Sequence, residues 1–218
     1  MNVLQQPESI IYQGQFGEFT ITASDRQSVM IYRAGLMVAA LSFAVGTGLV
    51  LWQGQNPLVL QALTPLYALF CLALGVSLVT IHIYMAVLHR VLQIFWAIGT
   101  VAGLLIILLS PLPFALTVYT QPAALFGIGF TFAALTGIFV KEAFCFNRLE
   151  TKLLTPLLPL LILGHLIGVS SPMLEQRLAA IVAVLFLIFA LRKAFQPIPP
   201  DIGDKTVFAA LANQSNHG

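Results

Sequence analysis

Two long stretches of this chain carry no charged residue, and they limit the folds that it can adopt. No Asp, Glu, Lys or Arg occurs from Ala34 to His89 or from Val91 to Val140, stretches of 56 and 50 residues. Each stretch is long enough for two membrane crossings of about 20 residues and a connecting loop. Only 8% of the 218 residues are charged, which is too few to cover the surface of a water-soluble globule. The chain is therefore an integral membrane protein.

The apolar runs predict an all-α membrane protein, a bundle of six transmembrane helices. The runs are continuously apolar and not alternating, which excludes barrel strands, and in lipid only a helix then satisfies its own backbone. The sixth run is short between Arg177 and Arg192, so either both arginines snorkel or the helix extends past them. The predicted helices are Ala34 to Trp52, Pro65 to Leu88, Val91 to Leu109, Ala123 to Val140, Leu153 to Val169 and Leu178 to Leu191.

Three regions follow from these helices: an N-terminal segment 1–33, a transmembrane domain 34–193 and a C-terminal tail 194–218. With six crossings, nine of the 10 Lys and Arg residues fall on the side that holds both termini, and only Arg177 falls on the other. Cytoplasmic loops of membrane proteins carry the excess of positive charge. We therefore expect both termini to be cytoplasmic, or stromal in a plastid.

Three segments outside the predicted helices also have patterns that indicate their structure. The mixture of glycine, aromatic and β-branched residues from Ile11 to Ser24 predicts a short strand or hairpin. The uncharged outer loop Ser110 to Pro122 either lies in the interface or dips back into the membrane. Prolines after Phe195 end the last helix, and a short helix from Lys205 to Ala212, capped by Asp204, is predicted in the tail.

Two histidines lie within the predicted spans and are candidates for a functional site. His165 either donates a hydrogen bond to a Ser, Thr or carbonyl of a neighbouring helix, or ligates the metal of a haem or chlorophyll. His82 shares a helical stripe with Met85 and His89, which suggests a ligand site. The two spans place His82 and His165 at depths that differ by roughly 13 Å, which argues against a shared metal. We expect no cofactor, with a haem or chlorophyll at these histidines as the alternative.

The inner loop 141–152 is the densest polar segment of the chain. Its side chains are the predicted surface for a partner protein, and Cys145 is either simply packed or a redox or acylation site favoured by nearby cations. Asn147 and Glu150 have the spacing of a capping box that opens the fifth helix. The residues predicted to bind a partner are Phe144, Cys145, Phe146 and Arg148.

Small residues at four-residue spacing indicate close helix packing, which favours a bundle over a channel. The chain has no selectivity-filter sequence, phosphate loop, HExxH motif or nucleophile elbow, so we expect no enzyme. A net charge of +2 without a basic stripe excludes nucleic acid as a partner. The stripes are Gly129, Ala133 and Gly137 on the fourth predicted helix and Ala40, Ala44 and Gly48 on the first.

Two stretches, YQGQFGEFTITASDR (Tyr12 to Arg26) and KEAFCFNRLETKLL (Lys141 to Leu154), resemble a domain-of-unknown-function family of integral membrane proteins found in cyanobacteria. The resemblance covers most of the chain but brings no catalytic residues. It implies a thylakoid or plasma membrane of a cyanobacterium and a link to photosynthetic complexes.

Three functions are compatible with the sequence. The first is a non-enzymatic factor that assembles, stabilises or regulates a larger membrane complex, with membrane lipids and complex subunits as partners and homo-oligomers as a further option. The second is a small-molecule or ion permease whose path passes His82 and the proline-loosened start of the fifth helix. The third is a haem- or chlorophyll-binding protein that uses His165.

Overall fold

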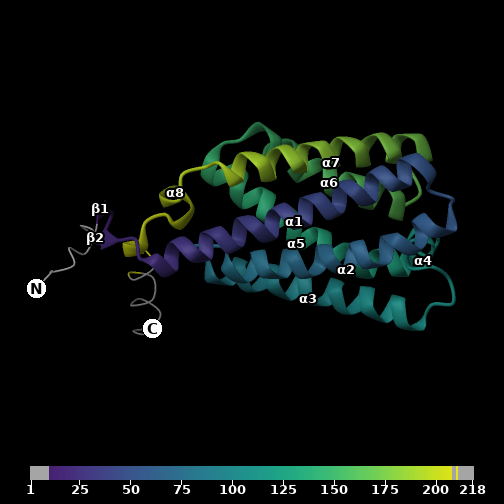
Figure 1. Ribbon diagram of the computed structural model, residues 1–218, viewed down its shortest axis with the longest axis horizontal. Coiled ribbons are helices and arrows are strands. Elements are labelled where there is room, and N and C mark those ends of the chain that lie inside the picture. The colour runs from purple at the N-terminus through teal and green to yellow at the C-terminus, as the bar shows by residue number, and fades with distance from the viewer. Residues whose placement is uncertain (1–9, 208–209, 211–218) are drawn as a thin grey trace, which may run out of the picture.

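A computed structural model of the chain describes residues 10–207 and 210. Within them six helices are long and apolar enough to cross a membrane. They lie side by side in one bundle and alternate in direction (Figure 1), which confirms the predicted all-helical bundle of six spans. Their bounds are α1 Ala23–Gln53, α2 Pro57–Thr80, α3 Ala86–Leu109, α5 Pro122–Phe146, α6 Leu149–Leu166 and α7 Pro172–Ala194.

The short elements lie at the two ends of the bundle (Figure 1). Strands β1 Ile11–Gly14 and β2 Gly17–Thr20 pair as an antiparallel hairpin, within the segment where the sequence indicates one. The hairpin and the four-residue helix α8 Pro199–Ile202 lie at one end, the α8 end. The opposite end, which we name the α4 end, carries the short helix α4 Phe114–Thr120.

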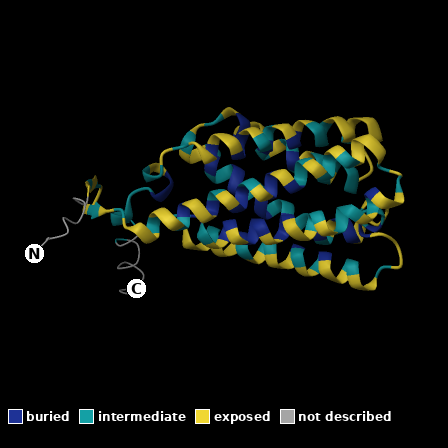
Figure 2. Ribbon diagram, in the orientation of Figure 1, coloured by how far each residue is buried: buried dark blue, intermediate teal, exposed yellow. Residues whose placement is uncertain are grey.

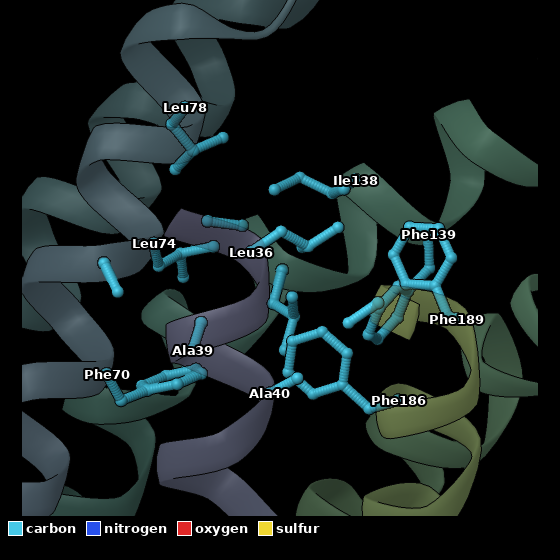
Figure 3. Packing of buried hydrophobic residues seen from close by; sticks show 14 of the residues in the cluster. Leu36, Ala39, Ala40, Phe70, Leu74, Leu78, Ile138, Phe139, Phe186 and Phe189 are labelled. Atoms are coloured by element: carbon cyan, nitrogen blue, oxygen red, sulfur yellow. The ribbon is translucent and has the colours of Figure 1, made fainter. Parts of the chain in front are cut away.

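The core lies where α1, α2, α5 and α7 meet, and large apolar side chains interdigitate there (Figure 3). Leu36, Leu74 and Phe186 are fully buried in it. The outer faces of the bundle are largely exposed (Figure 2). Large apolar residues are among the exposed ones, for example Val101 and Val184. Such an apolar outer surface suits lipid and not water.

Close helix contacts depend on glycine at two positions near the centre of the bundle. A Cβ atom on Gly99 of α3 would collide with Thr131 of α5. A Cβ atom on Gly75 of α2 would collide with the ring of Trp96, whose Nε1 donates to the Cys71 carbonyl at 2.8 Å. Small residues thus permit the backbones to approach, as they do in other membrane bundles.

Several helix ends differ from the predicted ones. Helix α1 begins 11 residues before the predicted Ala34, because Thr22 and Asp25 form a capping box that the hydropathy criterion does not see. Helix α2 ends at Thr80, so the predicted continuation to Leu88 is wrong. Ile81 there has extended backbone angles, and the ring of His89 bonds the Leu78 carbonyl at 2.5 Å.

The structure also decides the bounds of α7 and the way in which α6 begins. Helix α7 extends past Arg177 and Arg192, which confirms the second of the two alternatives for the sixth span. The predicted capping box of Asn147 and Glu150 is wrong, because Asn147 has a left-handed backbone (φ 52°) that ends α5. The N-cap of α6 is Arg148, which makes no side-chain capping bond.

The outer loop 110–122 folds back against the bundle. It forms α4, in which Phe114 and Thr117 are buried, and the Phe114 ring lies 4.7 Å from the Tyr67 ring of α2. In the tail, Asp204 accepts from the Thr206 amide at 2.9 Å, where a helical turn begins at Lys205. Residues 208–209 and 211–212 of the predicted tail helix lie outside the described residues.

Candidate functional site

The main polar site is a group of buried charges at the α8 end, which we name the ion cluster. It consists of Arg33 of α1, Glu142 of α5, Lys193 of α7 and Asp201 of α8. Lys193 Nζ donates to Glu142 Oε2 at 2.6 Å and to Asp201 Oδ1. Arg33 donates to Asp201 Oδ2 through Nε at 2.9 Å and Nη2 at 2.6 Å. The side chains of Lys193 and Glu142 are fully buried, so solvent does not screen this pair.

Neighbouring groups complete the bonding of Glu142. Its Oε1 accepts from Tyr32 Oη at 3.1 Å and from Lys141 Nζ at 2.9 Å. The Tyr32 carbonyl in turn accepts from Ser77 Oγ at 3.1 Å, which ties α1 to α2. The carboxylate therefore has two cations and a hydroxyl, as a buried charge requires.

A second ion group lies beside the first. Glu150 Oε2 accepts from Arg192 Nη1 at 2.8 Å, and Arg148 Nη2 donates to Gln196 Oε1 at 2.5 Å. Arg148 Nη1 and Glu150 Oε1 are buried, lie 4.0 Å apart and have no hydrogen-bond partner among the described residues. The ring of Phe146 lies 3.9 Å from Lys193 Nζ, so cations surround an aromatic face.

The tail and the hairpin are joined beyond the ion cluster. Asp204 Oδ2 accepts from the Gln15 amide at 2.6 Å, and Lys205 Nζ donates to Asp25 at 2.8 Å and to the Thr20 carbonyl at 3.2 Å. Hydrogen bonds donated by Thr206 and by the Gln15 amide hold the pKa of Asp204 below its ordinary value. The N-terminal and C-terminal segments thus form one polar assembly.

The four residues predicted to bind a partner differ in their exposure to solvent. Phe144 is 85% exposed and Cys145 is exposed, while Phe146 and Arg148 are partly buried and contact the charges described above. Phe144 and Cys145 are therefore the accessible part of this segment. Partner binding by this surface stays a prediction.

His82 lies outside any helix, in the connection 81–85 between α2 and α3. The predicted stripe with Met85 and His89 is wrong, because the helix breaks between His82 and His89. His82 is half-buried at the α8 end, and burial lowers its pKa. His165 is at the end of α6, near the α4 end, so the two histidines lie at opposite ends of the bundle.

His165 uses both of its ring nitrogens. Nδ1 is 2.8 Å from Glu175 Oε1 of α7, and Nε2 is 2.8 Å from the Tyr119 carbonyl of α4. Ser170 Oγ also donates to Glu175 at 2.9 Å. Because both partners of the ring are acceptors, His165 donates twice, as an imidazolium does. This arrangement leaves no nitrogen for an axial metal bond, so the geometry does not favour the haem or chlorophyll hypothesis.

A second candidate site is an apolar groove of about 300 Å³ on the outer face of α5, between α3 and α6. We name it the α5 groove. Its floor contains Gly129 and Ala133, two members of the small-residue stripe, whereas Gly137 packs tightly against Leu92 of α3. Aromatic side chains and a proline form much of its walls: Phe95, Phe126, Phe130, Phe132 and Pro159.

Comparison with protein families gave one match. Residues 76–210, which are more than half of the chain, match a family described as uncharacterized integral membrane protein, DUF2301. The chain belongs to the DUF2301 family. A comparison with curated proteins and a comparison with solved structures each found no match.

The DUF2301 match places both candidate sites in the shared part of the family. It includes every residue that lines the α5 groove and three of the four residues of the ion cluster, Glu142, Lys193 and Asp201. It also includes the resembling stretch that begins at Lys141, while the hairpin and Arg33 precede it. Membership shows a multi-pass membrane protein, and the cyanobacterial setting stays a prediction.

The ion cluster is the site that sequence reasoning missed. Glu142 was assigned to a polar loop, yet it lies on α5 four residues after the buried Ile138 and three after the buried Phe139. That helical spacing is a signal for an inward-facing carboxylate. No sequence signal brings Asp201 to Lys193 and Arg33, because their contact depends on how the tail folds back.

Proposed function

We propose that this DUF2301 protein is a non-enzymatic factor that helps to assemble, stabilise or regulate a larger membrane complex. In this proposal the α5 groove receives one transmembrane helix of a partner subunit. The observation that carries the proposal is the open position of Gly129. The groove lies on the surface of membrane-spanning helices, so its occupant is an apolar group that resides in the lipid bilayer.

The other glycines of the bundle support this reading of Gly129. Five of them stand where another helix of the same chain comes so close that a Cβ atom would collide: Gly35, Gly75, Gly99, Gly103 and Gly137. A Cβ atom on Gly129 would meet only Ile162 among the described residues, at 3.9 Å. Glycine thus serves close helix contacts at several positions of this chain. Gly129 is open, as Gly48 is, but only Gly129 of these two lies in the α5 groove.

The floor of the groove favours a helix over an acyl chain. Gly129 and Ala133 are one helical turn apart, which is the spacing that lets two helix backbones approach. Helix association in lipid depends on such packing, because lipid tails are as apolar as the side chains they replace. An acyl chain needs only an apolar surface and gains little from a small-residue floor.

Photo-crosslinking tests the proposal directly. Benzoylphenylalanine replaces Phe130 in the groove, and in a control chain it replaces Val184, which is exposed on α7 away from the groove. We expect the Phe130 position, and not the Val184 position, to yield one major polypeptide adduct whose linked peptide maps to a transmembrane helix. The crosslinked partner must also co-purify with the unmodified chain in mild detergent.

A pair of glycine variants separates the groove from a general effect on folding. Gly129→Leu fills the floor, and Gly48→Leu adds the same side chain at a position of α1 where nothing lies within 4 Å. We expect Gly129→Leu to reduce the adduct at least about tenfold and Gly48→Leu to leave it unchanged, while both chains keep wild-type thermal stability. Adducts with lipid or pigment alone, or equal adducts in both variants, would refute the proposal.

The same proposal includes an orientation in which the α8 end faces the cytoplasm. Its support is that nine of the 10 Lys and Arg residues cluster toward this end. Cys145 is exposed at this end, whereas Cys71 is buried. A membrane-impermeant maleimide should therefore label Cys145 in inside-out vesicles and not in intact cells. Labelling only in intact cells would reverse the orientation.

The two other functions predicted from sequence have their own tests. A haem or chlorophyll would give the purified protein an absorption band between the Soret and red regions. A permease would show flux in reconstituted vesicles that a His82→Ala variant abolishes. No contact of the described residues favours either function over the proposal.

A further inference from the structure

The tail of the chain lies in a site that recognises it as a peptide. Arg33 donates not only to the Asp201 carboxylate but also to two backbone carbonyls, Gln196 O at 2.5 Å through Nη1 and Pro197 O at 2.9 Å through Nη2. Lys193 holds the other oxygen of the Asp201 carboxylate. The acceptors of Arg33 are thus one carboxylate and two backbone carbonyls, all from a single segment of the chain. The ligand chemistry of this site is therefore an acidic peptide segment.

The site is built to hold this carboxylate. Without Asp201 the cations Arg33, Lys141 and Lys193 would face the single carboxylate of Glu142, an excess of two positive charges. Leaving such charges buried and unpaired is strongly unfavourable. Apolar side chains would stabilise a helix end at least as well as ions do, so the ions are better explained by selection of one docking segment.

The segment that docks is an arm attached at one point. Helix α7 ends at Ala194, and the following residue Phe195 is 86% exposed. Three prolines at 197, 199 and 200 then stiffen the arm. Exchange of an identical segment between copies is a low-cost route to dimers, and two copies in one membrane present their α8 ends on the same side.

We propose that residues 196–204 form an exchangeable arm, and that the Arg33–Lys193 site accepts this arm either from its own chain or from a second copy of the chain. The second copy fits because its arm has the same carboxylate, carbonyls and prolines. This inference does not depend on the α5 groove, and it would survive if the groove proved to be empty.

Peptide binding tests whether the site accepts the arm from outside the chain. The receptor is the full-length Asp201→Ala chain in mild detergent, whose own arm lacks the key carboxylate. The probe is a fluorescent synthetic peptide of residues 196–206, compared with Asp201→Asn and Asp204→Asn versions that have equal net charge. We expect the Asp201→Asn peptide to bind at least about tenfold more weakly and the Asp204→Asn peptide less than about threefold. Equal losses would show non-specific attraction and overturn the proposal.

A second measurement uses the natural arm and does not rely on the Asp201→Ala chain. A Cβ atom on Gly14 would lie 2.9 Å from Asp204 Cγ, so cysteines at these positions can form a disulfide when the arm is docked. Two tagged full-length copies are co-expressed, one with Gly14→Cys and one with Asp204→Cys, both with the native cysteines replaced by serine. We expect a disulfide between the copies that falls at least about tenfold when the Gly14→Cys copy also carries Arg33→Gln. The absence of this disulfide, or a yield that Arg33→Gln leaves unchanged, would overturn the proposed exchange of the arm.

Discussion

Replacing Lys193 by Met removes the central cation of the ion cluster and keeps most of the apolar stem. Loss of one partner of a buried ion pair costs about 3–5 kcal/mol. Here Glu142 keeps Lys141 at 2.9 Å and Asp201 keeps Arg33 at 2.6 Å, so neither carboxylate loses its last cation. We therefore expect the lower limit, about 3 kcal/mol, which corresponds to a melting temperature lower by roughly 6–12 °C for a chain of this size.

The buried thiol of Cys71 provides the assay. This thiol is 2% exposed, so it reacts with a thiol-sensitive dye only when the bundle opens, provided that the exposed Cys145 is replaced by Ser. The Glu142→Gln and Lys193→Met changes should show a coupling of about 1–3 kcal/mol in the double-mutant cycle, because both remove the same buried ion pair. A Lys193→Met chain as stable as wild type, or additive effects of the two changes, would refute the role given to this pair.

Two further predictions concern other contacts of the described residues. Because donors lower the pKa of Asp204, its bond to the Gln15 amide is fully present above the ordinary carboxyl pKa and is lost as the pH falls through the lower folded value. The protection factor of the Gln15 amide against hydrogen exchange should show this loss. In the Asp204→Asn chain this protection factor should no longer depend on pH. Gly99→Ala would force α3 from Thr131 and destabilise the chain by about 1–3 kcal/mol in the thiol assay; Gly48→Ala serves as the neutral control.

The sequence was sufficient for the number of spans, because long charge-free stretches are strong, additive signals. Helix ends were less predictable where tertiary contacts decide them. The end of α2 at Thr80 has no proline or glycine to mark it, and His89 reaches back to the Leu78 carbonyl from the next helix. The start of α1 had a readable signal in the Thr22 and Asp25 capping box, which an apolar criterion overlooks.

The candidate site was predictable only in part. The stripe containing Gly129 was recognised, but sequence could not show that Gly137 packs inside the bundle while Gly129 lies in an open groove. The ion cluster joins Arg33 to Asp201 across 168 residues, and no periodicity records such a contact. His165 was expected to bond a carbonyl, and it does so with Tyr119, but its second partner Glu175 was not anticipated.

The distance along the chain between Arg33 and Asp201 has a consequence for biosynthesis. Arg33 reaches the membrane interface when α1 inserts, and its partner Asp201 is synthesised 168 residues later. At ordinary ribosomal speeds of about 5–20 residues per second, this interval lasts roughly 8–34 s. A nascent or truncated chain that stops before the arm therefore keeps an unneutralised arginine at its end.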